Sequence, residues 1–191
     1  MNKKVTFKIS MTGLAIALII IAQLFGKLLP TGFTFFGPFS VNQLITGSIV
    51  NLILVLLTIE IGIYYSAVAG ILSSVMAMIL QIGPIFPQLV VFIALSNIIL
   101  VSVVYYLRLI DKFINKNVAL IISVVVAAFI KFIFLKFTIP LSFNMISGIS
   151  EVQIKVLSVM FSWPQLITAL IGGFIALSVN KMLEIKNIDY K

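Results

Sequence analysis

Six long runs of apolar residues constrain the fold of this chain more than any other feature of its sequence. They cover residues 9–29, 41–59, 61–82, 85–107, 118–137 and 163–183. A helix needs about 20 apolar residues to cross the hydrocarbon core of a bilayer, and each run is close to that length. A mean hydropathy of +1.27 with only 9% charged residues excludes a water-soluble globule. The sequence therefore predicts an all-α integral membrane protein, in which residues 1–191 form a single bundle of six transmembrane helices.

The breaks between the runs carry residues that end or begin helices. Gly83-Pro84 separates the third run from the fourth. Glu60-Ile61-Gly62 is the weakest break, but the runs on its two sides together have about 40 residues, twice what one crossing needs, so we expect two helices there. Three helix starts are predicted by the Ser-x-x-Gln spacing of a capping box: Ser40 with Gln43, Ser150 with Gln153, and Ser162 with Gln165.

The positions of the basic residues predict the orientation of the bundle. With the N-terminus inside, nine Lys and Arg residues fall on the cytoplasmic side and four on the outer side, namely Lys27, Lys131, Lys136 and Lys155. Because cytoplasmic loops carry the excess of positive charge, both termini are expected to be cytoplasmic. The net charge of +8 then follows from membrane topology, and nucleic-acid binding is not expected.

The residue inventory excludes most catalytic chemistry. Cysteine and histidine are absent, and none of the five carboxylates lies inside a long apolar run: Glu60, Asp111, Glu151, Glu184 and Asp189. We therefore expect no catalytic residue, no metal site and no cofactor, since acid–base catalysis and metal binding need such groups. Gly26-Lys27 lacks the upstream glycine of a phosphate-binding loop, so any ATP hydrolysis must come from another protein. The chain is predicted not to be an enzyme.

Lys131 is the most informative single residue because a charge within a span is costly. Ser123, Ala127 and Lys131 follow each other at intervals of four, so they share a helix face of small and polar side chains that should point into the bundle. Lys131 would then be a cation for a carboxylate or phosphate of a substrate. The alternative is a lysine that snorkels to the outer interface beside Lys136.

Four uncharged residues at a similar expected depth are further candidates for substrate binding: Gln88, Asn97, Trp163 and Gln165. An amide in hydrocarbon must find a partner, which is either a neighbouring helix or a ligand. For Gln165 the capping box is an alternative role, and Trp163 suits either an interfacial anchor or a stacking surface for a flat ring. Asn97 has no such alternative.

Small residues at intervals of four predict close helix packing. We expect the series in 61–82 (Ser66, Gly70, Ser74) and in 163–183 (Ala169, Gly173) to pack inside the bundle. The pair Gly13 and Ala17 lies in a first run that is otherwise amply apolar. Its small face is therefore a candidate contact for another subunit.

Several stretches together resemble a known family. They are Asn51–Leu57, Gly70–Ser73, Gly83–Gln88, Phe92–Asn97 and Ser162–Ile167, followed by a last run that contains glycines. In this order the pattern is similar to the substrate-binding (S) component of an energy-coupling factor (ECF) transporter.

The resemblance implies a function and a set of partners. It implies a pocket near the outer surface for one vitamin or related micronutrient, capped by the loop after the first helix. It also implies a membrane coupling subunit and two ATPase subunits as partners. The family docks through an Ala-x-x-x-Ala pattern on the first helix, for which this chain has Gly13 and Ala17, so glycine replaces the first alanine. The predicted function is that of an ECF-type substrate-binding subunit in a bacterial plasma membrane, and Lys131 suggests an anionic substrate.

Two other classes of function stay open. A stand-alone secondary transporter or channel is one, although ion-coupled carriers usually need an acidic residue within the membrane. An intramembrane enzyme or an assembly factor is the other, and for an enzyme the sequence offers no evident general base.

Overall fold

Helices form wherever the sequence has a long apolar run, as the computed structural model of residues 3–28, 34–36, 39–83 and 86–188 shows. The helices corresponding to the six runs are α1 (Lys3–Leu28), α2 (Val41–Glu60), α3 (Ile63–Ile79), α4 (Pro87–Leu107), α5 (Lys116–Ser142) and α7 (Trp163–Ile188). Five helices of the described chain are long and apolar enough to cross a membrane, while α3 has 17 residues. This architecture agrees with the predicted all-helical, multi-pass membrane protein.

Short elements connect the long helices. The 3-10 helix η1 (Arg108–Lys112) joins α4 to α5, and η2 (Phe143–Met145) with α6 (Glu151–Met160) joins α5 to α7. Between α1 and α2, β1 (Thr34–Phe36) and β2 (Phe39–Ser40) form a small antiparallel ribbon. The expected cap over the pocket falls on this connection, where residues 29–33 and 37–38 lie outside the described part of the chain.

The break at residues 60–62 separates two helices, as predicted. Gly62 has a φ of 109°, a conformation that residues with a side chain rarely adopt, so the chain leaves α2 here and starts α3 at Ile63. The third run ends earlier than the expected 61–82. Gln81 has a φ of 55°, and the amides of Ile82 and Gly83 both donate to the carbonyl of Ala77, which closes the end of α3 in a tight turn.

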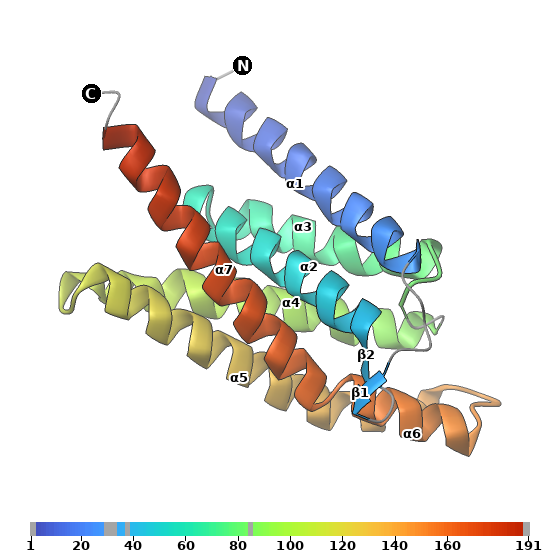
Figure 1. Cartoon of the computed structure of the whole chain (residues 1–191). Coiled ribbons are helices and arrows are strands. Elements are labelled where there is room, and N and C mark those ends of the chain that lie inside the picture. The colour runs from blue at the N-terminus through green and yellow to red at the C-terminus, as the bar shows by residue number, and fades with distance from the viewer. Residues whose placement is uncertain (1–2, 29–33, 37–38, 84–85, 189–191) are drawn as a thin grey trace.

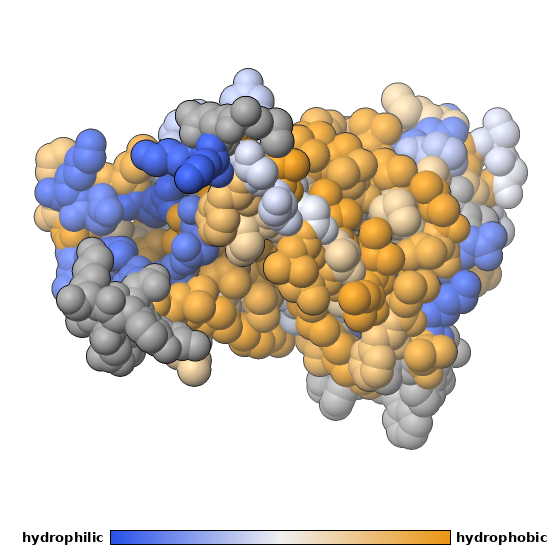
Figure 2. Space-filling model, turned by 90° about the horizontal axis from the view of Figure 1, so that it is seen from above, coloured by the Kyte–Doolittle hydropathy of each residue, from blue (hydrophilic) through white to orange (hydrophobic). Residues whose placement is uncertain are grey.

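The helices are arranged so that the two ends of the bundle differ (Figure 1). The first residues of α1, the α2–α3 turn, the α4–α5 connection and the last residues of α7 lie at one end, called here the termini end. The ribbon, the α3–α4 turn and α6 lie at the other, called the pocket end. Figure 2 shows one face of this bundle, where hydrophobic residues form a broad band and hydrophilic residues gather toward both ends. Such a band matches a multi-pass membrane protein.

Small residues let the inner helices approach closely. Ser66, Gly70 and Ser74 of α3 are buried, and so are Ala169 and Gly173 of α7, as their spacing predicts. At Gly172 a side-chain carbon would collide with the backbone of α2, which shows how tightly α7 packs there. The sheltered faces of α2, α3, α5 and α7 therefore surround a dense interior.

The capping predictions have different outcomes. At α6 the Ser150 hydroxyl accepts from the Gln153 amide, and the Gln153 side chain accepts from the Ser150 amide, which confirms a capping box. At α7 the predicted helix start is confirmed, because the helix begins at Trp163, directly after Ser162, but the Ser162 side chain has a different partner from the one a capping box requires. The Ser162 hydroxyl donates to the Val159 carbonyl, because α6 ends just before α7 begins and its last carbonyls need donors. The Ser40 side chain lies outside the described part of the chain.

Candidate functional site

A cavity of about 190 Å³ lies at the pocket end, among α1–α5 and the junction of α6 with α7. Much of its polar lining comes from amides and hydroxyls, and its one charged side chain among the described residues is Lys131. Half-buried residues such as Asn42, Gln43 and Ile82 form part of its wall. The cavity therefore combines a mostly uncharged lining with a single positive charge.

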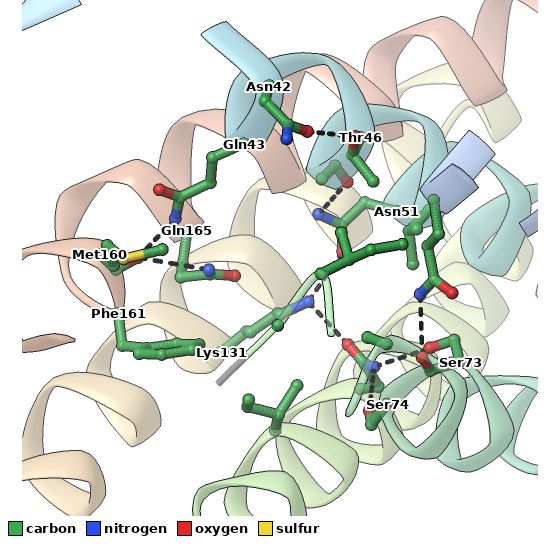
Figure 3. Close-up of a pocket in the computed structure, with 18 residues that line it drawn as sticks. Asn42, Gln43, Thr46, Asn51, Ser73, Ser74, Lys131, Met160, Phe161 and Gln165 are labelled. Carbon is green, nitrogen blue, oxygen red and sulfur yellow. Dashed lines mark hydrogen bonds between the residues drawn. The ribbon is translucent and has the colours of Figure 1, made fainter. Parts of the chain in front are cut away.

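Lys131 projects from α5 into the bundle, at the centre of a hydrogen-bond network (Figure 3). Its Nζ donates to Asn51 Oδ1 and to Asn97 Oδ1, each at 2.8 Å, and the residue is 3% exposed. Ser123 and Ala127 are buried on the same face, as predicted. The structure thus favours the interpretation of Lys131 as an interior cation over that of a snorkelling lysine, whereas Lys136 is exposed.

No carboxylate of the described chain pairs with Lys131. The described carboxylates lie at or near the ends of elements: Glu60 ends α2, Asp111 is in η1, Glu151 begins α6, and Glu184 lies in the last turns of α7. A buried ammonium with only neutral amide partners has no opposite charge beside it, so the cost of its desolvation is only partly offset. Among the described residues, the cavity therefore contains a lysine without a protein counter-charge.

Asn97 is held in one orientation by α3. Its Nδ2 donates to the Gly70 carbonyl at 3.1 Å, to Ser74 Oγ at 3.2 Å and to Ser73 Oγ at 3.4 Å. Because a backbone carbonyl only accepts, the amide nitrogen must face α3 and the amide oxygen must face Lys131. Asn97 therefore positions the Lys131 ammonium and has little hydrogen-bonding capacity left for a ligand.

Asn51 of α2 has the same role from the other side, and the sequence interpretation did not single it out as a site residue. Its Nδ2 donates to the Gly47 carbonyl at 2.8 Å and lies 3.5 Å from Thr168 Oγ1, which leaves Oδ1 for Lys131. An amide in the middle of the apolar run 41–59 was the available signal, because such a group needs a partner in hydrocarbon.

Gln165 lies in the wall of the cavity, at the junction of α6 and α7. Its Nε2 donates to the carbonyl of Met160 at 3.3 Å, and Gln43 Nε2 from α2 donates to the same carbonyl at 2.8 Å (Figure 3). Met160 is the last residue of α6, so its carbonyl has no partner within that helix. The hydrogen bonds of the two glutamines thus connect the end of α6 to α2 and α7.

The other two predicted binding residues lie elsewhere. Gln88 Nε2 donates to the Met145 carbonyl at 3.4 Å in an exposed position, and Gln88 does not line the cavity. Trp163 is the first residue of α7, is half-buried, and is likewise absent from the lining. Of the five predicted residues, the structure therefore brings together Asn97, Lys131 and Gln165.

Gln23 of α1 is a lining residue for which the sequence interpretation had no role. It is 4% exposed, and its Nε2 donates to the Ser73 carbonyl at 2.9 Å. Its Oε1 has no hydrogen-bond partner among the described residues. As with Asn51, the available signal was a polar side chain within an apolar run.

Gly13 and Ala17 lie on an exposed face of α1. A side-chain carbon added to Gly13 would meet no atom within 4 Å, and Ala17 is also exposed. An apolar groove runs beside this face, lined by Met11 and Leu14 of α1 and by Leu52 of α2. Gly13 and Ala17 thus face away from the bundle, unlike the small residues of α3 and α7 described above.

Comparison with protein-family models, with curated proteins and with solved structures finds no match to this chain. Function therefore has to follow from the geometry of the site and the chemistry of its residues.

Proposed function

We propose that this protein is a membrane-embedded binding subunit that captures a small anionic solute, as the substrate-binding component of an ECF-type importer. The observation that carries the proposal is the Lys131 ammonium, which is buried at a cavity and has only amide oxygens as described partners. A carboxylate or phosphate of the solute would supply the missing counter-charge, and hydrogen bonds between charged groups are the stronger ones.

The supply of energy from partner subunits fits the chemistry of the chain. Its described carboxylates all lie at or near element ends, so the spans offer no acidic residue for coupling to an ion gradient. We propose instead a membrane coupling subunit and two ATPase subunits as partners. A stand-alone secondary transporter or channel is the alternative, and uptake into liposomes by the purified chain alone under an ion gradient would favour it.

The placement in the cell follows from the charge distribution. We propose a bacterial plasma membrane with both termini in the cytoplasm, so that the pocket end faces outward and a vitamin-like micronutrient enters the cavity from outside. The proposal draws on the excess of basic residues toward the termini end.

Native mass spectrometry of the purified chain tests the binding role. We expect a discrete additional mass that is retained in Lys116→Met, the matched control on the same helix, and is lost in Lys131→Met. Removing one partner of a buried charge pair costs about 2–5 kcal/mol, which weakens binding by at least about 30-fold. An unmodified chain with no added mass and no thermal shift across a vitamin panel would contradict the proposal.

The exposed face of α1 is the proposed docking surface for the coupling subunit. Ala17→Phe fills this face from the outside and leaves the interior intact, so we expect a folded, ligand-binding protein that no longer co-purifies with the coupling and ATPase subunits of its native host. Val125→Phe on the exposed side of α5 is the matched control. Equal co-purification of both variants would place the docking surface elsewhere.

A further inference from the structure

Besides Lys131, the lining of the cavity includes Gln23, whose side-chain oxygen differs from most polar atoms of the site in its hydrogen bonding. Gln23 reaches the cavity from α1 and bonds to Ser73, which lies on one side of Lys131 in Figure 3, while Gln165 and Met160 lie on the other. The oxygen is buried and has no hydrogen-bond partner among the described residues. A buried amide oxygen without a partner is costly, so this side of the cavity lacks a donor.

The orientation of the Gln23 amide is fixed by its neighbour. Nε2 donates to the Ser73 carbonyl, a group that only accepts, so a flipped amide would bring two acceptors together. Oε1 is consequently the atom that is left over, and it is available only as an acceptor.

The neighbouring donors are already engaged. The hydroxyls of Ser73 and Ser74 both donate to the Gly70 carbonyl, at 2.9 and 3.1 Å. The Asn97 amide donates to the same carbonyl and to these two hydroxyls. None of these three residues has a hydrogen left to direct at Gln23, so a molecule that enters the cavity can supply the missing donor.

The volume of the cavity indicates the size of molecule that it can surround. A cavity of about 150 Å³ in another protein accommodates benzene, and the present one measures about 190 Å³. A single ring with one or two small substituents matches this space.

We propose that the ligand is a compact ring compound with two different polar ends: an anionic group for Lys131 and an N–H or O–H donor for the Gln23 oxygen. This inference rests on the proposed binding function and adds the second contact, which makes α1 part of the recognition site. Gln23 selects for the donor, and Lys131 selects for the charge.

Calorimetric titration of the detergent-solubilised protein with ring carboxylates tests the inference. The probes are benzoate, which has no donor, and 3- and 4-aminobenzoate, which add an N–H donor at two positions. We expect at least one aminobenzoate to bind the unmodified protein about tenfold more tightly than benzoate, the effect of one hydrogen bond to a buried oxygen. This comparison does not depend on the folding of any variant.

The variant Gln23→Met keeps the length of the side chain and removes the acceptor. We expect it to abolish the preference for the aminobenzoate over benzoate, and Gln88→Met, outside the cavity, to keep the preference. Equal affinity of the unmodified protein for all three probes, or an equal loss for benzoate and aminobenzoate in Gln23→Met, would overturn the inference and leave the proposed function intact. Failure of all three probes to bind at millimolar concentration would also overturn the inference, while native mass spectrometry tests the proposed function separately.

Discussion

Two lysines of α5, 15 residues apart, differ in their burial and in the partners of their charge. Lys116 begins the helix at the termini end, where its Nζ lies 2.7 Å from the Glu184 carboxylate and 57% of the side chain is exposed. Lys131 lies deep in the bundle, 3% exposed, with only the amide oxygens of Asn51 and Asn97 as partners. The first charge is neutralised by the protein and hydrated by water, and the second is neither.

Arg108, at the same end of the bundle, follows the pattern of Lys116, because its partners belong to the protein. Arg108 donates to the Ile59 carbonyl at 2.5 Å and lies 5.0 Å from the centre of the Tyr105 ring, so it joins α4 to α2 through groups that the protein itself provides. Around Lys131 the protein provides orientation but no counter-charge. This difference is the basis of the proposed ligand-binding role of the pocket end.

Lys116 has a carboxylate partner, and a variant that gives Lys131 such a partner should change ligand binding the most. Asn51→Asp places a carboxylate next to the Lys131 ammonium at the cost of the donor to the Gly47 carbonyl. The internal ion pair competes with any anionic ligand, so we expect the affinity for ring carboxylates to fall at least about 100-fold in calorimetric titration.

A control for this prediction uses the same chemical change at a solvent-exposed cap. Asn115 caps α5 by accepting from the Asn117 amide, a role that aspartate fills equally well, so Asn115→Asp should leave both affinity and melting temperature unchanged. Undiminished anion affinity in a folded Asn51→Asp protein would show that Lys131 does not meet the ligand.

The helices of this fold could be predicted from sequence because each depends on a local property. Runs of about 20 apolar residues fix where helices form, and Gly62 marks where α2 must end. The early end of α3 was not foreseen, because residues 80–82 are as compatible with a helix as those before them, and the turn depends on amides that converge on the Ala77 carbonyl.

The site was predictable only where one residue carried the signal alone. Lys131 was recognisable as a charge among apolar residues, and the small face that it shares with Ser123 and Ala127 correctly indicated an interior position. Its partners could not be assigned, because Asn51 and Asn97 lie 46 positions apart and meet only through the packing of α2 and α4 around α5. For Gln88 the sequence signal was misleading. Its expected depth suggested substrate binding, but it lies at the start of α4, outside the lining of the cavity.

The smallest expected effect comes from weakening the pair at the termini end. Glu184→Gln removes the charge that faces Lys116 but keeps an oxygen that can accept from Lys116 and from Asn180. Because both side chains are substantially exposed, we expect a loss below about 1 kcal/mol of unfolding free energy, one that shrinks further as salt is added. Ring-carboxylate affinity should stay the same, since Lys116 lies 15 residues before Lys131 along α5 and outside the lining of the cavity. A melting curve with and without added salt, measured beside a titration, checks both statements. A binding defect in this variant would mean that the Lys116–Glu184 pair is coupled to the cavity. It would contradict the view that Lys116 has only a structural role.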